Sequence, residues 1–357
     1  MDSNHNKHHS SSQSEDLKLC FLSIDSQTLG KLLKLKITSV KQFHDRKSAV
    51  KRVISKDAIQ EIEEKFANVS KFQSKVSVSA FERWKRNESE KEHCIRSFSQ
   101  KIDQKLNGGF QSGIIYEFVG APGSGKTQFC LQLLANAFVP RVLQGPQAES
   151  AVFIDTETSF FSTRFSSVLS KTISHCQSLH PKLLNDPTFN IESIIKRIRG
   201  FRCHTSEDLL VLLQTLNSEL RKPNSTKPKL IVIDSVASPF RVSHFESVKK
   251  RCNAIAYLSC LLVQLLNSTG ACIVLSNHIT TKLVDNSQGV IVGNYFVPLL
   301  GDFWGTTAHV RILLSEDSVG RKMTVFKMMS EKRELENEAS VFQITKNGIR
   351  DVNLNSK

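Results

Sequence analysis

The chain has 357 residues, 39% of them hydrophobic and 23% charged, which is an ordinary globular composition with room for two domains. Its net charge of +14 favours a polyanionic partner, either nucleic acid or an acidic membrane surface, over a basic protein with no such partner. The first residues lack the apolar stretch of a secretory signal, and no apolar run approaches a membrane span. These features predict an intracellular protein that does not cross a membrane.

The N-terminal quarter of the chain is expected to form a small helical domain between two less ordered segments. Residues 1–16 are polar and rich in Ser, His and Asn, which predicts a disordered tail. Residues 17–69 show helical spacing, and residues 70–96 form a polar, charged linker. The apolar stripes of the helical part are Leu29, Leu32 and Leu33, then Ala58, Ile59, Ile62 and Phe66.

Strand and helix signals alternate over residues 97–351, which predicts an α/β domain with a mostly parallel central sheet, followed by a short tail at 352–357. The expected strands are Ile114–Val119, Ala151–Asp155, Ile198–Cys203, Leu230–Asp234, Ala271–Ser276, Val310–Leu314, Met323–Met328 and Val341–Thr345. The expected helices include Thr127–Ala137, Ser206–Leu220 and Ser247–Leu266. Thr205 and Asp208 have the spacing of a capping box at the start of the second of these helices.

A phosphate-binding loop is predicted directly after the first of these strands. The pattern G-x-x-x-x-G-K-[ST] is matched by Gly120-Ala121-Pro122-Gly123-Ser124-Gly125-Lys126-Thr127. Between a strand and a helix, backbone amides and the positive helix end converge on an anion. Lys126 would reach the β- and γ-phosphates, and the Thr127 hydroxyl would hold Mg²⁺. The alternative is a glycine-rich turn that precedes a lysine by chance.

Two later strands end in carboxylates that suit the same crevice, because ligands bind beyond the carboxyl ends of parallel strands. Asp234 follows the apolar run 230–233 and would orient water on Mg²⁺, although apolar strands also end in Asp at ordinary turns. Glu157 follows Asp155-Thr156 and would position or deprotonate the attacking water. The alternative for Glu157 is helix capping by Thr156–Ser159. A third strand end, Ser276-Asn277-His278, offers polar groups for sensing the γ-phosphate.

The order of these motifs resembles the RecA-like core of eukaryotic DNA strand-exchange recombinases, over most of the chain. Leu106-Asn107-Gly108-Gly109-Phe110 resembles the turn that enters that core. Within the family the sequence most resembles the C-type recombinase paralogue, and one segment is also similar to a sister paralogue that pairs with it. The segments that carry the C-type resemblance include Phe201-Arg202-Cys203, Pro239-Phe240-Arg241, Thr280-Thr281-Lys282 and Gly348-Ile349-Arg350-Asp351.

This resemblance implies a RecA-like P-loop ATPase core preceded by a small helical domain. The implied activity is that of an ATP-binding, DNA-dependent ATPase of homologous recombination and double-strand-break repair, including meiotic recombination, in the nucleus. The implied partners are other recombinase paralogues, the main strand-exchange recombinase, and single-stranded or branched DNA, with roles in strand exchange and Holliday junction processing. The implied cofactors are ATP and Mg²⁺, and the implied site residues are Lys126 and Glu157 for catalysis, Thr127 and Asp234 for the metal, and Arg164 against the adenine.

In recombinases two segments face DNA, and here they would fall near Arg241–Arg251 and Thr280–Leu300. Basic side chains there would neutralise phosphates, and a few aromatic ones would stack on bases. The cationic candidates are Arg241, Lys249, Lys250, Arg251 and Lys282, and the aromatic ones are Phe245, Tyr295 and Phe296. The alternative for 249–251 is the solvated face of a helix that begins near Ser247.

Two departures from the family pattern bear on hydrolysis. His278 stands where glutamine is usual, and Thr158 stands where glycine is usual. Both affect the expected rate of hydrolysis more than nucleotide binding, so slow turnover is expected. They also motivate a different function, an assembly scaffold in which ATP stabilises a protein–protein interface with little turnover.

Overall fold

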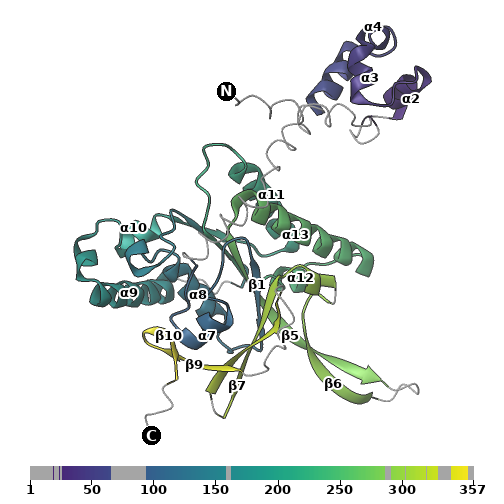
Figure 1. Cartoon of the computed structure of the whole chain (residues 1–357). Coiled ribbons are helices and arrows are strands. Elements are labelled where there is room, and N and C mark those ends of the chain that lie inside the picture. Colours follow the sequence, from purple (N-terminus) through teal and green to yellow (C-terminus); the bar gives the residue numbers. More distant parts are fainter. Residues whose placement is uncertain are drawn as a thin grey trace, which may run out of the picture. The chain divides into compact units, whose positions relative to one another are not determined.

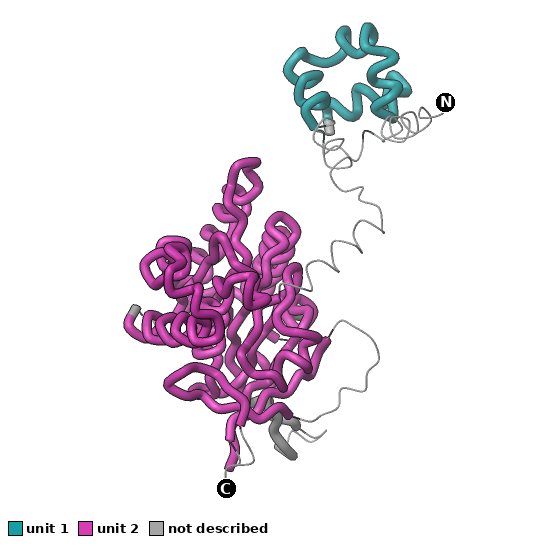
Figure 2. The backbone as a smooth tube through the Cα atoms, turned by 60° about the vertical axis from the view of Figure 1, so that its left-hand side comes forward, with its two compact units in different colours: residues 1–86 teal, residues 87–357 magenta. Residues whose placement is uncertain are grey.

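The computed structural model describes residues 19, 24, 26–65, 94–157, 162–285, 291–301, 303–318, 320–328 and 339–352, with the backbone alone at 26, 162, 281–285, 291–296 and 303. The chain divides into two compact units, residues 1–86 and 87–357 (Figure 2). The predicted tail at 1–16, residues 353–357 of the predicted tail at 352–357, and residues 70–93 of the predicted linker at 70–96 lie outside the described residues.

The first unit is helical. It contains α2 (Ser26–Lys34), α3 (Val40–Asp45), α4 (Lys47–Val50) and a further helical stretch at 56–65. Its core includes Leu32, Phe43 and Ile62, all essentially inaccessible to solvent. Leu33 was expected on the same stripe as Leu32 but is half exposed, because a helix of nine residues buries only a narrow face.

The second unit is built on a central sheet (Figure 1). Among the described residues the strand order is β10-β9-β8-β7-β1-β5-β4-β2-β3, with β6 paired to β5. Along this order, neighbouring strands from β7 through β1, β5, β4 and β2 to β3 are parallel. Neighbouring strands from β7 through β8 and β9 to β10 are antiparallel, as is the β5–β6 pair. The strands are β1 (Ile115–Gly120), β2 (Ala151–Asp155), β3 (Ile198–Arg202), β4 (Leu230–Asp234), β5 (Cys272–Asp285), β6 (Ile291–Pro298), β7 (Val310–Asp317), β8 (Gly320–Lys327), β9 (Ser340–Thr345) and β10 (Gly348–Asp351).

Helices cover both faces of this sheet and bury two separate apolar clusters (Figure 1). One face packs on α7 (Gln100–Lys105), α8 (Lys126–Asn136), α9 (Ser162–Leu179) and α10 (Ile191–Ile195). The other packs on α11 (Ser206–Leu220), α12 (Ser238–Val242) and α13 (Val248–Thr269). Alternate residues of β4 enter opposite clusters, as the two-residue period of a strand requires. Short 3₁₀ turns are η2 (Arg141–Leu143), η3 (Pro181–Asn185) and η4 (Phe303–Thr306).

The predicted α/β fold with a mostly parallel sheet is confirmed. The bounds of β2, β4 and α11 agree with the sequence prediction, and Thr205 and Asp208 form the expected capping box. The principal difference is β5, which continues past Ser276 to Asp285 and pairs with β6, a strand that was not predicted. The residues beyond Ser276 are not an apolar run, and their pairing with β6 makes them a strand.

The core unit begins before residue 97, where the predicted linker was to end. Cys94 and Ile95 are buried, and Ile95 exchanges backbone hydrogen bonds with Phe110 at 2.9 Å in both directions. Residues 94 and 95, which the predicted linker included, therefore belong to the core of the second unit.

The apolar helix α13 continues to Thr269, three residues beyond the end at Leu266 that the sequence predicted. By length and composition α13 is apolar enough to cross a membrane. Its residues Leu258, Leu262 and Leu265 are fully buried in the cluster that it shares with α11. The buried side of α13 therefore packs against one face of the sheet.

Candidate nucleotide site

The predicted phosphate loop connects β1 to α8. Gly123 and Gly125 have φ values of 82° and 103°, in the left-handed region that L side chains rarely adopt. A side chain at Gly120 would place its Cβ 2.5 Å from the carbonyl oxygen of Leu314. These three glycines are therefore required by the backbone, and they leave the loop amides free of side-chain cover.

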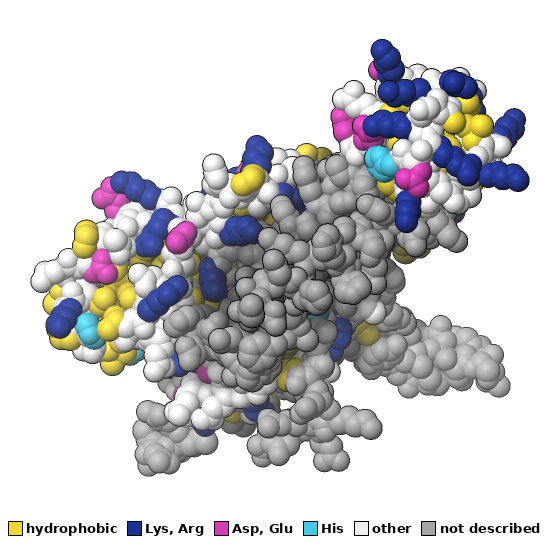
Figure 3. Space-filling model, turned by 45° about the horizontal axis from the view of Figure 1, so that its top comes forward, with side chains coloured by type: hydrophobic (Ala, Val, Ile, Leu, Met, Phe, Trp, Pro, Cys, Tyr) yellow, Lys and Arg dark blue, Asp and Glu magenta, His cyan; other side chains and the backbone are white. Residues whose placement is uncertain are grey.

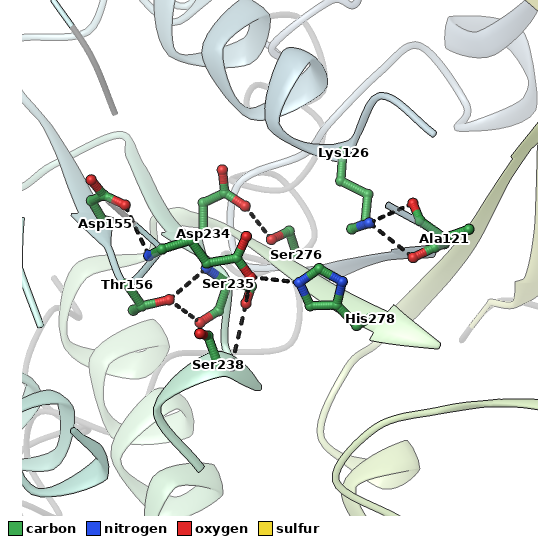
Figure 4. Close-up of polar contacts among 11 residues, drawn as sticks. Ala121, Lys126, Asp155, Thr156, Asp234, Ser235, Ser238, Ser276 and His278 are labelled. Carbon is green, nitrogen blue, oxygen red and sulfur yellow. Dashed lines mark hydrogen bonds and ion pairs between the residues drawn. The ribbon is translucent and has the colours of Figure 1, made fainter. Parts of the chain in front are cut away.

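The strand register brings the other predicted residues to the loop. Gly120 pairs with His278 across β1 and β5, and Asp155 pairs with Asp234 across β2 and β4. Because these strands are parallel, their carboxyl ends meet at one edge of the sheet, where Figure 4 shows the polar side chains gathered. The expectation that Asp234 and Lys126 face one crevice is met, since both line a cavity of about 480 Å³.

Asp234 is almost fully buried, with 1% of its surface exposed. The hydroxyl groups of Ser276 and Thr127 donate to its carboxylate, yet burial outweighs them and raises the pKa of Asp234. Its Oδ2 has no hydrogen-bond partner among the described residues. A buried carboxylate oxygen left unpaired beside a threonine hydroxyl is a donor set that suits Mg²⁺.

Lys126 begins α8 and folds back on the loop. Its Nζ donates to the carbonyl oxygens of Gly120 at 2.8 Å and Ala121 at 2.9 Å (Figure 4). Burial lowers the pKa of Lys126, while Glu157 and Asp234 act in the opposite direction. The ammonium group is thus held at the loop with no direct carboxylate partner among the described residues, so it remains available to an anion. Ser124 Oγ in the same loop is also buried without a partner among the described residues.

Glu157 accepts hydrogen bonds from a residue within β5 and from the residue that directly follows β4. His278 Nε2 and Ser235 Oγ each lie 2.5 Å from Glu157 Oε1. The hydrogen bond from His278, ahead of that from Ser235, lowers the pKa of Glu157, so the carboxylate is ionised at neutral pH. These contacts face the cavity, which favours the catalytic interpretation of Glu157 over helix capping. Residues 158–161, including Thr158, lie outside the described part of the chain.

The three predicted sensor residues separate in the structure. Ser276 contacts Asp234 and His278 contacts Glu157, but the Asn277 side chain points away to Glu117. Successive strand side chains alternate between faces, so Asn277 cannot share the cavity with its neighbours.

Other residues of the cavity were predicted in part. Arg164 lines it, as the resemblance implied, and its Nη2 donates to Gln128 Oε1 at 2.9 Å. Pro122 also lines it, whereas Gln128, Arg321 and Ile344 were missed. Gln128 directly follows the phosphate-loop motif, which could have drawn attention to it. Arg321 and Ile344 come from β8 and β9, and no local pattern marks them.

A buried charge network behind the loop was also missed. Glu117 in β1 is fully buried and accepts from Asn277 Nδ2 at 2.7 Å, Trp304 Nε1 at 2.7 Å and Arg311 Nε at 2.6 Å. Asn277 Nδ2 also donates to the carbonyl oxygen of Leu299, just after β6. Glu117 therefore connects β1, which leads into the phosphate loop, with β5. Through Asn277 it is also connected to Leu299, at the end of β6.

The predicted DNA contacts lie on α12, on α13 and in β5. Arg241, Lys249 and Lys250 are exposed, and Arg251 is half-buried. Lys250 pairs with Glu246, and Lys282 lies in β5 with its side chain outside the described residues. The first turn of α13, which Ser247 caps, contains no acidic residue to offset the positive helix end.

Of the proposed stacking aromatics, Phe245 stacks on Phe240 with ring centroids 6.2 Å apart and packs partly against the core, so one face of its ring is already occupied. Tyr295 and Phe296 lie in β6, and their side chains are outside the described residues.

A parallel sheet with the phosphate loop on a central strand and an antiparallel edge makes this unit a RecA-like P-loop core. The Rad51 family model matches residues 89–352. The chain therefore belongs to the Rad51 family, which confirms the recombinase resemblance.

Several relatives have curated names. "DNA repair protein RAD51 homolog 3" of Cricetulus griseus is 33% identical over 274 residues, covering 73% of this chain and 70% of that protein. The protein of the same name from Dictyostelium discoideum is 31% identical over 73% of this chain and 66% of its own length. "DNA repair and recombination protein RadA" of Methanoculleus marisnigri is 26% identical over 64% of this chain and 67% of its own length.

Proposed function

We propose that this protein is an ATP-binding, DNA-dependent ATPase of homologous recombination and double-strand-break repair, including meiotic recombination. The observation that carries the proposal is the convergence of Lys126, Thr127, Asp234 and Glu157 on one cavity in a chain of the Rad51 family. A phosphate loop alone is shared by many enzymes, whereas this set supplies the groups that phosphoryl transfer to water requires.

Each residue has a distinct part in that chemistry. Thr127 and Asp234 would hold Mg²⁺, which supplies charge neutralisation on the phosphates. Lys126 would exchange its contacts with the carbonyls of Gly120 and Ala121 for phosphate oxygens. Glu157 is the base that positions and deprotonates water, and its low pKa makes it a weak one. This weakness supports slow turnover.

The proposed partners are single-stranded or branched DNA, other recombinase paralogues and the main strand-exchange recombinase, in the nucleus. The net charge of +14 and the exposed cations at the start of α13 support DNA binding. The first unit is basic as well, and Figure 3 shows many of its Lys and Arg side chains at the surface. Assistance in strand exchange and Holliday junction processing is proposed from the family resemblance.

Two variants test the function. Lys126→Ala removes nucleotide binding, whereas Glu157→Gln keeps binding and removes hydrolysis. If both lose repair activity in cells while retaining their partners, turnover is required. If only Lys126→Ala loses activity, the scaffold function replaces the ATPase proposal; the partnered Glu157–His278 pair is the observation that favours that alternative.

DNA binding is tested by salt dependence. Replacement of Lys249, Lys250 and Arg251 by Ala should make the slope of log K against log salt less negative by about 2 for single-stranded DNA. An unchanged slope would remove this surface from the proposal.

A further inference from the structure

The antiparallel edge of the sheet forms one wall of the nucleotide cavity. Arg321 pairs directly with Phe342 across β8 and β9, so the two side chains share a face. Phe342 contacts Phe129 of α8, with ring centroids 5.1 Å apart. Two residues further along β9, Ile344 lies 2.8 Å from where a Cβ on Gly125 would be. This face of the edge therefore lies over the phosphate loop.

Arg321 is the cation on that wall. It lines the same cavity as Lys126 and Asp234, about 200 residues away in sequence from the loop. Its Nη2 lies 3.2 Å from Glu316 Oε2, and its side chain is 30% exposed. Its Nε is buried without a hydrogen-bond partner among the described residues. The guanidinium is thus held by one exposed carboxylate, and its enclosed Nε donor is unused among the described residues.

We propose that Arg321 binds the phosphate chain of the nucleotide and exchanges Glu316 for it. A guanidinium offers paired donors that match phosphate oxygens, and an enclosed donor without a partner gains most from such a ligand. The exchange costs little, because half of the Glu316 side chain is exposed and solvent can replace its partner. Glu316 then competes with the nucleotide for Arg321. This inference rests on the proposed nucleotide binding.

The test compares single and double variants of the full chain by calorimetry with Mg-ADP and Mg-GDP. Arg321→Met should weaken ADP binding about 10-fold to 100-fold, the range of a hydrogen bond to a charged group. The loss should be the same factor for GDP, because phosphates and not the base are contacted. Lys322→Met is the matched control, since its side chain points to the opposite face of β8 and pairs with Asp317.

Glu316→Gln should leave nucleotide affinity unchanged if Arg321 has a purely structural role. It should tighten ADP binding by about twofold to fivefold, because it removes an exposed competing carboxylate. In the double variant Glu316→Gln/Arg321→Met this gain should disappear. Thermal unfolding without nucleotide checks that each variant is folded.

These measurements distinguish failure of the nucleotide-binding function from failure of the Arg321 assignment. If the natural protein binds neither nucleotide, the nucleotide-binding function itself fails. If it binds ADP and the folded Arg321→Met variant binds equally well, Arg321 is not a nucleotide ligand. A loss for ADP that greatly exceeds the loss for GDP would overturn the phosphate assignment and place Arg321 at the base. A Glu316→Gln variant with unchanged or weaker binding would overturn the exchange.

Discussion

Replacing Asp234 by Asn should stabilise the nucleotide-free protein while weakening its response to Mg-nucleotide. Asp234 is 1% exposed, and its Oδ2 is unpaired among the described residues. Leaving a buried polar group unpaired costs about 1–3 kcal/mol, and more when it is charged. The amide still leaves one group unpaired, so we expect a gain of about 1–2 kcal/mol. For a domain of this size, that is about 2–4 °C in melting temperature for each kcal/mol.

The pH dependence follows from the raised pKa of Asp234. Between its unfolded and folded pKa values the native state binds more protons than the unfolded chain, so this group lowers stability as pH rises through that window. The full penalty is present above the folded pKa. The gap in melting temperature between Asp234→Asn and the natural protein should therefore be largest at neutral pH and should close as the pH falls through the folded pKa.

Thermal unfolding measured with and without Mg-ATP provides the assay. A ligand at one hundred times its dissociation constant adds about 2.7 kcal/mol to the natural protein, and the variant should gain less when Mg²⁺ is present. Asp155→Asn is the control on the neighbouring strand, where the carboxylate accepts from the Glu157 backbone at 3.1 Å and lies 4.0 Å from Arg202. It should not stabilise the protein. A nucleotide-free Asp234→Asn variant that melts at or below the natural protein would refute the reasoning.

Three further predictions concern the site and its support. Glu117→Gln should destabilise the protein by about 3–5 kcal/mol, because it removes the charge partner of the largely buried Arg311, whereas the exposed carboxylate variant Glu219→Gln should leave the stability nearly unchanged in the same denaturant titration. His278→Gln should raise the pKa of Glu157, since the histidine hydrogen bond is the main cause of its lowering, and the acid limb of the ATPase pH profile should move to higher pH. Gly125→Ala should cost about 1–3 kcal/mol in backbone strain and abolish nucleotide binding by calorimetry, and a variant that binds normally would contradict the required φ of 103°.

Local patterns in the sequence were enough to predict the phosphate loop, the ends of β2 and β4, and the capping box of α11. Each of these depends on residues within a few positions of one another, where backbone conformation and helix or strand period act directly. Glu157 and Asp234 were identified because they end apolar strands, and the parallel register brings such ends to one edge. The short reach of these rules also explains the misjudged start of the core near Cys94 and the missed strand β6.

Contacts between distant parts of the chain were decided by the tertiary structure alone. Glu157 meets His278 across 121 residues, and Glu117 meets Arg311 across 194. Sequence spacing does not encode such pairs, because sheet order and register determine which side chains meet. Burial acts at the same level, since within the described part of the chain it leaves Asp234 with an unpaired oxygen and encloses one nitrogen of Arg321. Residue order therefore specifies the chemistry that the site holds, and packing sets its charges and available partners, because desolvation depends on neighbours brought together only by folding.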